Sequence, residues 1–379
     1  MKVVIAIDSF KGSLSTFAAG AAAKRGLLRA CADARVEVFP LADGGEGTTE
    51  AIVSATGGER VSLTVTGPHG RPMQAEYGVT PDGVAVLEMA SAAGITLVSE
   101  AERNPLTTTT YGVGEMIAHA VARGIRRFII GIGGSATNDG GVGMLSALGI
   151  AFLDGNGQPI SRGAQGLCSL ARIDTANALP SLAECEFRIA CDVTNPLCGE
   201  RGCSAVYGPQ KGATKESIPQ MDAWLAHYAA LTRDVLPNAD PDFPGAGAAG
   251  GLGFAFLAYL GGRLCSGIEL VIEATGIERH LADADLVITG EGRLDGQSCM
   301  GKAPVGIGMA AKRHGKAVLA LSGCVTEDAA ICNRHGIDAF FPILPAPCTP
   351  AEAMDEQNAA RNLANTAEQA MRLFLMGRR

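Results

Sequence analysis

The chain has 379 residues, of which 47% are hydrophobic, 18% are charged and 5% are aromatic, and its net charge is −8. This composition is typical of a well-packed globular enzyme, and it excludes a disordered or fibrous chain and argues against a nucleic-acid partner. The opening MKVVIAIDSF lacks the pattern of a signal peptide and no apolar run approaches the ~20 residues of a membrane span, so we expect a soluble cytoplasmic protein without membrane contact.

The N-terminal part of the chain alternates between apolar strands and helices. Val3–Ile7 and Arg35–Phe39 have the β-branched, apolar character of buried strands. A helix ending near Leu28 is predicted after the first strand, and a helix at Thr48–Thr56 after the second. This repetition of strand, loop and helix predicts a doubly wound parallel sheet.

The middle of the chain has a different pattern. Three predicted strands separated by GPHG and PDG turns indicate antiparallel hairpins. Two later strands each end at a loop rich in glycine or polar residues. The predicted elements are strands Val61–Thr66, Arg71–Val79 and Val84–Glu88, helix Tyr111–Ala122, and strands Arg127–Ile132 and Glu186–Ala190.

The alternation resumes near the C-terminus, with strands at Asp285–Thr289, Ala317–Leu321 and Ala339–Pro342 and one last helix, Ala351–Leu375. We therefore predict an α/β fold with two α/β domains. Residues 1–60 plus 280–379 would form a discontinuous Rossmann-like doubly wound domain, and residues 61–279 an inserted mixed α/β domain. An active-site cleft is expected between them, because ligands bind beyond the carboxyl ends of strands and often at domain interfaces.

The segment Phe128–Gly143, FIIGIGGSATNDGGVG, is the most informative loop of the sequence. An apolar strand that runs into glycines and then a helix leaves backbone N–H groups uncovered, which favours phosphate binding. The polar side chains of this loop could contact a ligand or a metal. They are Ser135, Thr137, Asn138 and Asp139.

The same loop also resembles a dinucleotide fingerprint. Gly131–Ala136 matches G-x-G-x-x-A, and Asp154 lies about 20 residues further on. However, Gly140, Gly141 and Gly143 fall where that motif requires a continuous helix, and each glycine costs a helix interior about 1 kcal/mol relative to alanine. We therefore expect the helix to begin near Gly141, after a longer phosphate loop.

Charged residues follow several other predicted strands. Lys11 could bind a phosphate or carboxylate, Asp43 could bind Mg²⁺ or substrate hydroxyls, and Asp192 could accept a hydroxyl proton. A capped helix start, a plain turn and an Asx turn are the respective structural alternatives.

The loop TGEGRLDGQSCMGKAP offers both acids and cations: Glu291 and Asp295 for Mg²⁺, and Arg293 and Lys302 for phosphate. Its G-x-x-x-x-G-K pattern is not a P-loop, because Ala303 replaces the required Ser or Thr. The segment Gly245–Gly253 indicates either close approach to a ligand or tight helix packing.

Seven segments of the chain together resemble the bacterial class I glycerate kinases, and the resemblance runs from Met1 to about Pro342. No single motif is diagnostic, but their order along the chain is specific to this family. The motifs are DSFKGSLS, ADGGEGT, GIGGSATNDGG, CDVTNPL, YGPQKGA, PGAGAAGG and ITGEGRLDGQS.

The resemblance implies ATP- and Mg²⁺-dependent phosphorylation of D-glycerate to 2-phosphoglycerate, in the breakdown of glycerate, glyoxylate or sugar acids. It also implies a Rossmann-like domain beside a second α/β domain. Two alternatives stay open: phosphorylation at the 3-position, and an NAD(P)-dependent hydroxy-acid dehydrogenase. A non-catalytic sensor of a phosphorylated ligand is disfavoured by the many strand-end carboxylates, and a homodimer stays open.

On this basis we assign roles to the candidate residues. The triphosphate would bind Gly133, Gly134, Ser135 and Thr137, supported by Lys302 or Lys211. Asp192 would be the general base, and Lys11 or Arg293 would bind the substrate carboxylate or the transferring phosphate. Mg²⁺ would bind Asp295 or Glu291, with Asp43 as a further candidate.

Overall fold

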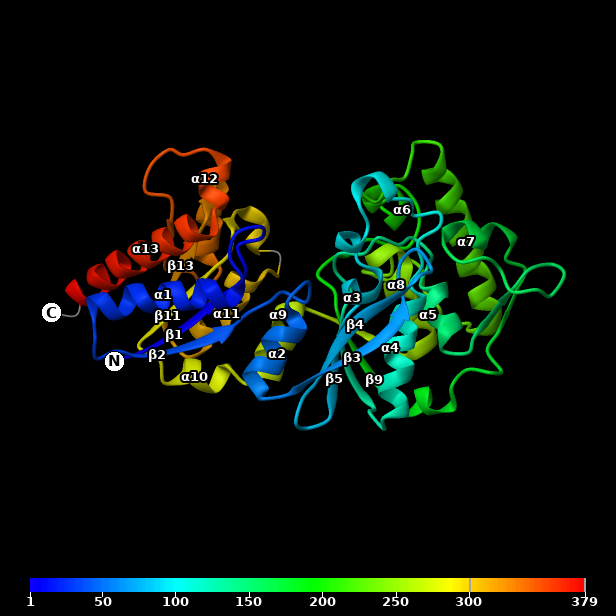
Figure 1. The fold of residues 1–379 in the computed structure, drawn as a ribbon, viewed down its shortest axis with the longest axis horizontal. Helices are drawn as coiled ribbons and strands as arrows, with labels where there is room; N and C mark the ends of the chain where they lie inside the picture. The colour runs from blue at the N-terminus through cyan, green and yellow to red at the C-terminus, as the bar shows by residue number, and fades with distance from the viewer. Residues whose placement is uncertain (300, 378–379) are drawn as a thin grey trace. The chain divides into compact units, whose positions relative to one another are not determined.

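The computed structural model describes residues 1–299 and 301–377, and its contacts divide the chain into two compact units. Unit 1 comprises Met1–Asp43, Ser54–Thr56 and Gly267–Arg379, and unit 2 comprises Gly44–Val53 and Gly57–Ser266. Each unit combines a central sheet with helices (Figure 1), so the predicted α/β class is confirmed. The domain boundaries inferred from the sequence stay a prediction.

Unit 1 is built on a five-stranded sheet in the order β15-β13-β11-β1-β2. Every neighbouring pair in it is parallel, as the alternation of strands and helices predicted. All these strands therefore end at the same edge of the sheet. The strands are β1 (Lys2–Ile7), β2 (Arg35–Pro40), β11 (Leu286–Gly290), β13 (Ala317–Ser322) and β15 (Ala339–Pro342), with a separate short pair, β12 (Arg293–Leu294) and β14 (Cys324–Val325).

Helices bury both faces of this sheet. Val3, Ile5 and Ile7 of β1 pack in one apolar cluster with side chains of α1 and α13, which lie side by side (Figure 1). Val4 and Ala6 point to the opposite face and are equally buried, which explains why the strand is apolar throughout. The helical segments are α1 (Thr16–Ala30), α9 (Gly267–Thr275), α10 (Glu278–Ala282), η6 (Gly296–Cys299), α11 (Ala303–Arg313), η7 (Glu327–Arg334), α12 (Pro350–Met354) and α13 (Glu356–Met376).

The prediction of one C-terminal helix, Ala351–Leu375, is wrong. The chain forms α12 and α13, separated at Asp355, whose φ of −62° and ψ of 126° are extended. The Asp355 side chain accepts a hydrogen bond from the backbone N–H of Asn358 and caps the second helix. A strong N-cap residue inside a helical pattern thus starts a new helix at this point.

Unit 2 is built on a six-stranded sheet in the order β10-β9-β6-β5-β4-β3. The pairs β3–β4 and β4–β5 are antiparallel, which confirms the predicted hairpins, whereas β5–β6, β6–β9 and β9–β10 are parallel. The strands are β3 (Glu59–Thr66), β4 (Pro72–Val79), β5 (Val84–Glu88), β6 (Arg127–Gly131), β9 (Glu186–Ala190) and β10 (Arg263–Cys265), with a separate antiparallel hairpin, β7 (Ala151–Leu153) and β8 (Arg172–Asp174).

The core of unit 2 is centred on buried aromatic side chains. Phe128 of β6 stacks on Phe187 of β9 with 4.9 Å between ring centroids, and Phe256 of α8 packs against Phe187 at 6.1 Å. The helices are α3 (Ala90–Ala93), α4 (Tyr111–Ala122), α5 (Val142–Ala147), α6 (Cys203–Tyr207), α7 (Ser217–Val235) and α8 (Ala248–Leu260), with short turns η1 (Ile95–Leu97), η2 (Glu100–Glu102), η3 (Ala164–Ser169), η4 (Pro180–Glu184) and η5 (Pro209–Lys211). Helix α2 (Thr48–Thr56) contributes residues to both units.

The contact between α1 and α13 depends on Gly26. A Cβ atom at this position would lie 1.9 Å from the backbone oxygen of Ala364, which a side-chain rotation cannot relieve. We predict that Gly26→Ala lowers the free energy of unfolding by about 1–3 kcal/mol, although helix propensity alone would favour alanine by about 1 kcal/mol. Urea unfolding of the two proteins measures this difference.

Gly377→Ala is the matched control, since its added Cβ would lie at ordinary contact distance, 3.7 Å from Phe374 O. Equal loss of stability in both variants, or none in Gly26→Ala, would contradict the packing argument.

Candidate active site

Unit 1 has a charged cavity at the edge of the sheet where its strands end. β1 pairs in parallel with both β2 and β11, so the loops that follow these three strands meet there. The cavity has a volume of about 400 Å³. It brings together six residues singled out from the sequence, together with Asp8: Lys11, Asp43, Glu291, Arg293, Asp295 and Lys302.

Asp8 is the acid of this cavity that the sequence analysis did not select. It directly follows β1, it is 7% exposed, and its Oδ1 accepts a hydrogen bond from the backbone N–H of Ser9 at 2.7 Å. Burial, reinforced by the charge of Asp43, raises the pKa of Asp8 to about 7. An acid directly after a buried strand was the available signal, and the same signal did select Asp192.

Glu291 and Asp295 form the acidic side of a small ionic network. Ser298 donates a hydrogen bond from its hydroxyl to Glu291 Oε1 at 2.5 Å, and burial raises the pKa of Glu291. Lys302 Nζ lies 3.9 Å from Glu291 Oε2 and 3.8 Å from Asp295 Oδ1. Arg293 Nε lies 3.3 Å from Asp295 Oδ2. Lys302 therefore lies beside both acids of this loop, and Arg293 lies beside Asp295.

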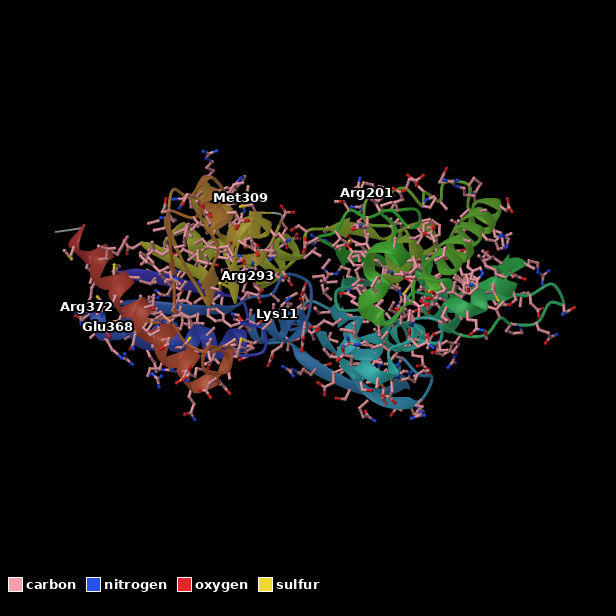
Figure 2. The ribbon with its side chains drawn as sticks, turned by 90° about the horizontal axis from the view of Figure 1, so that it is seen from above. Lys11, Arg201, Arg293, Met309, Glu368 and Arg372 are labelled. Atoms are coloured by element: carbon pink, nitrogen blue, oxygen red, sulfur yellow. The ribbon has the colours of Figure 1, made fainter. Side chains whose placement is uncertain are left out.

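Lys11 reaches the same cavity from the loop between β1 and α1. Its side chain is exposed, and Figure 2 shows it in the same part of unit 1 as Arg293. Thr16 holds the base of this loop, since its hydroxyl donates to Ile7 O at 2.7 Å and accepts from the backbone N–H of Leu41 at 2.8 Å. This buried hydroxyl thereby links the ends of β1 and β2.

The acids of this cavity fit a partial set of Mg²⁺ ligands. Over the described residues, no three His, Cys, Asp or Glu side chains are grouped so that they could hold a metal ion alone. Mg²⁺ in phosphoryl-transfer sites usually binds only one or two carboxylates and takes its other ligands from phosphates and water. Glu291 and Asp295 offer this kind of incomplete set, and Asp43 lines the same cavity.

In unit 2, the glycine-rich loop after β6 has an exposed part and a buried part. Gly133 and Gly134 are exposed, and the φ of +73° at Gly134 is a conformation that side chains disfavour. Ser135 and Thr137 are buried. The hydroxyl Oγ1 of Thr137 has no hydrogen-bond partner among the described residues. The loop thus offers an open backbone for a ligand and one buried hydroxyl without a partner.

Lys211 lies beneath this loop. It is 2% exposed, and its Nζ donates to Ser135 Oγ at 2.7 Å and to Thr137 O at 2.6 Å. Burial lowers the pKa of Lys211 to about 8. No described carboxylate forms an ion pair with it. A buried ammonium group without a counter-ion gives the loop a positive potential, and such perturbed groups cluster at functional sites.

Asn138 and Asp139 are turned inward, away from the exposed part of the loop, and their contact with a ligand stays a prediction. Both are almost completely buried, because the positive φ angles of Gly140 and Gly141 turn the chain inward. Asp139 accepts hydrogen bonds from the backbone N–H groups of Thr110 at 2.8 Å, Gly141 at 3.1 Å and Gly143 at 3.3 Å. Through these buried hydrogen bonds, Asp139 stabilises the conformation of the loop.

The start of α5 also weakens the dinucleotide alternative. As predicted, the helix begins at Val142, next to Gly141. Gly131–Ala136 consequently do not open a helix, which the dinucleotide fingerprint requires. The Gly245–Gly253 segment packs tightly instead of presenting backbone to a ligand: a Cβ on Gly250 would lie 2.1 Å from Thr137 O.

Two further acids of unit 2 lie at or just beyond the ends of strands. Asp192 is exposed directly beyond β9, and its role as a base stays a prediction. Glu88, which the sequence analysis did not select, ends β5 and accepts hydrogen bonds from the backbone N–H groups of Gly47 and Thr49 at 3.2 and 2.7 Å. Glu88 thereby stabilises the start of α2.

None of the helices within the described residues is both long and apolar enough to cross a bilayer. Comparison with known proteins gives consistent matches over nearly the whole chain. A family profile described as the Glycerate kinase family matches residues 3–375.

Among curated proteins, the Glycerate 2-kinase of Escherichia coli strain K12 is 46% identical over 98% of this chain and 99% of its own. The Glycerate kinase of Halalkalibacterium halodurans is 45% identical over 96% and 97%. A crystal structure of a protein assigned as glycerate kinase 2 from Salmonella typhimurium LT2 is 46% identical, with a TM-score of 0.89 over 100% of this chain and 99% of that one.

The raised pKa of Asp8 predicts a pH-dependent stability. The native protein keeps a proton on this carboxyl up to about pH 7, whereas an unperturbed aspartate with a pKa of 3.8 releases it much earlier. The native state thus binds more protons in that interval, and the contribution of Asp8 to the free energy of unfolding falls as the pH rises. Asp8→Asn should therefore gain stability relative to the wild type between pH 5 and pH 8, by on the order of a few kcal/mol.

Urea unfolding at both pH values checks this prediction, with Asp33→Asn, an exposed aspartate of the same unit, as the control. A difference between Asp8→Asn and the wild type that stays constant with pH would show that Asp8 ionises normally.

Proposed function

The chain belongs to the glycerate kinase family, and on that premise we propose that it transfers the terminal phosphoryl group of ATP to the 2-hydroxyl of D-glycerate. The reaction would require Mg²⁺ and give 2-phosphoglycerate. The choice of the 2-position is supported by the similarity to the E. coli protein named Glycerate 2-kinase. Membership of the glycerate kinase family is by itself the basis for assigning a kinase activity to the chain.

The charged cavity of unit 1 is the observation that best supports this reaction. Phosphoryl transfer depends on positioning and on neutralising charge as it moves between oxygens, with little covalent help from the protein. A cavity that alternates carboxylates with Lys11, Arg293 and Lys302 provides both cations for phosphate and acids for Mg²⁺. When bound, Mg²⁺ would neutralise phosphate oxygens; Glu291 and Asp295, with Asp43 as a further ligand, would hold it.

The roles proposed for the cations follow from their surroundings. Lys302, within 4 Å of Glu291 and Asp295, would contact a phosphate that shares the metal with these acids. Arg293 and the exposed Lys11 would bind the substrate carboxylate or the phosphoryl group in transfer. Because a guanidinium group can donate two parallel hydrogen bonds, Arg293 is the better match for a carboxylate.

The glycine-rich loop of unit 2 is proposed to bind the triphosphate of ATP. Gly133 and Gly134 would donate backbone N–H groups, and the hydroxyls of Ser135 and Thr137 would add hydrogen bonds. Lys211, the buried cation beneath the loop, would attract the anion without needing to leave its place, since it already orients Ser135 and Thr137.

Product analysis tests the proposal directly. Purified protein incubated with D-glycerate, ATP and Mg²⁺ should form 2-phosphoglycerate, identified by ³¹P and ¹³C NMR from the carbon that couples to phosphorus. Reactions lacking glycerate, ATP or Mg²⁺ are the controls. Formation of 3-phosphoglycerate would overturn the regiochemistry alone, whereas the absence of any phosphorylated product would overturn the proposed activity. A nicotinamide absorbance change with glycerate would support the dehydrogenase instead.

Asp192 is proposed to accept the proton of the attacking hydroxyl. Replacing it by asparagine keeps its size and removes the basic carboxylate, so Asp192→Asn should lower kcat by at least ~10²-fold. Steady-state kinetics with saturating ATP and glycerate measures this change.

Asp234→Asn serves as the control, because Asp234 is an exposed aspartate on α7 of the same unit. If Asp192→Asn turns over at nearly the wild-type rate, then Asp192 is not the base, and the assignment of the other residues is unaffected.

A further inference from the structure

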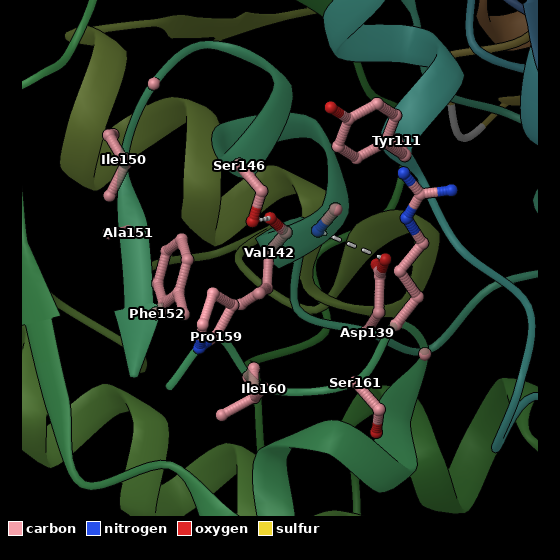
Figure 3. Close-up of a pocket in the computed structure, with 14 residues that line it drawn as sticks. Tyr111, Asp139, Val142, Ser146, Ile150, Ala151, Phe152, Pro159, Ile160 and Ser161 are labelled. Carbon is pink, nitrogen blue, oxygen red and sulfur yellow. Dashed lines mark hydrogen bonds between the residues drawn. The ribbon is translucent and has the colours of Figure 1, made fainter. Parts of the chain in front are cut away.

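Unit 2 contains a second cavity, which has no residue in common with the charged cavity of unit 1. It lies beside α5 and the β7 strand and has a volume of about 360 Å³ (Figure 3). One wall is apolar, formed by Val142, Ile150, Phe152, Pro159 and Ile160. A cavity of this size holds a small organic molecule, and its apolar wall favours one with a hydrophobic part.

The polar side of this cavity is dominated by one cation. The guanidinium carbon of Arg162 lies 3.9 Å from the centroid of the Tyr111 ring, so the planar group is held by a cation–π contact. Over the described residues, Arg162 makes neither an ion pair nor a hydrogen bond. Tyr111 also lines this cavity, and its hydroxyl group has no described partner.

The acid of the cavity does not neutralise this cation. The Oδ2 atom of Asp139 accepts hydrogen bonds from the backbone N–H and the hydroxyl of Thr110 at 2.8 and 3.0 Å and from the backbone N–H of Gly143 at 3.3 Å. Its Oδ1 atom accepts from Gly141 N at 3.1 Å. Since these donors occupy the carboxylate, the donors of Arg162 are left for another anion.

We propose that this cavity is a second ligand site, which binds a small organic anion with an apolar body. The anionic group, a carboxylate or a phosphate monoester, would pair with Arg162 and accept a hydrogen bond from Tyr111. The apolar body would pack against Ile150, Phe152 and Ile160. This site is separate from the kinase reaction proposed above and does not depend on it.

A methyl NMR titration of the full-length protein tests the site. Benzoate and phenyl phosphate represent the two anionic groups, and benzyl alcohol is the neutral probe of similar size. At least one anion should shift the methyl signals of Val142, Ile150 and Ile160 in a saturable way, and benzyl alcohol should bind at least about tenfold more weakly. The tighter of the two anions identifies the preferred group. The methyl signals of Ile343, which lines the cavity of unit 1, report binding elsewhere.

Arg162→Met keeps the apolar bulk of the side chain and removes its charge, so it should weaken anion binding at least about tenfold. Arg172→Met, at an exposed arginine of β8, is the matched control and should bind as the wild type does. Three results would each overturn the proposal: no saturable shift with either anion, equal binding of benzyl alcohol, or unchanged affinity in Arg162→Met. Because the comparison with benzyl alcohol uses the wild type, the test holds even if Arg162→Met folds poorly.

Discussion

The parallel pairing of β1 with both β2 and β11 is the constraint on which the charged cavity depends. In a parallel sheet all strands end at one edge, so Asp8, Asp43 and Glu291 come together although they are distant in sequence. Carboxylates gathered in this way repel one another, and burial adds to the effect by disfavouring their charged forms. The cations that line the same cavity offset part of this repulsion. An acidic sheet edge of this kind requires such compensation to be stable.

A second constraint operates at the glycine-rich loop, where a positive charge is buried beneath the backbone of the loop. Lys211 is buried beneath Ser135 and Thr137, and its two hydrogen bonds fix the loop in place. Burying an ammonium group without a counter-ion is unfavourable, which is why its pKa falls to about 8. An anion bound at the loop would offset this cost by supplying a counter-charge. The loop therefore combines rigidity with a positive potential, as a phosphate site requires.

The sequence predicted the backbone far better than it predicted the direction of side chains. Apolar strands separated by helical segments were enough to locate the parallel sheet of unit 1. The glycines at 140 and 141, which are unfavourable in a helix interior, were enough to place the start of α5. The same reasoning led us to expect the side chains of Asn138 and Asp139 on the ligand-facing side of the loop. A local sequence pattern does not show that the loop turns inward against Thr110 and α8. It also missed Asp8, whose pKa is raised chiefly by burial in the folded chain and further by the charge of Asp43. Side-chain burial in loops is decided by tertiary packing, which spacing does not encode.

The proton on Asp8 links the electrostatics of the cavity to its chemistry. Among the described residues that line the cavity, Asp8, Asp43, Glu291 and Asp295 face only Lys11, Arg293 and Lys302 as cations. With a pKa of about 7, Asp8 is half-protonated near neutral pH, which brings the cavity close to electrical balance before any ligand binds. A divalent cation entering the cavity would favour the charged carboxylate and displace that proton. Asp8 is thus only partly ionised near neutral pH, and a bound metal ion would increase the fraction of its charged form.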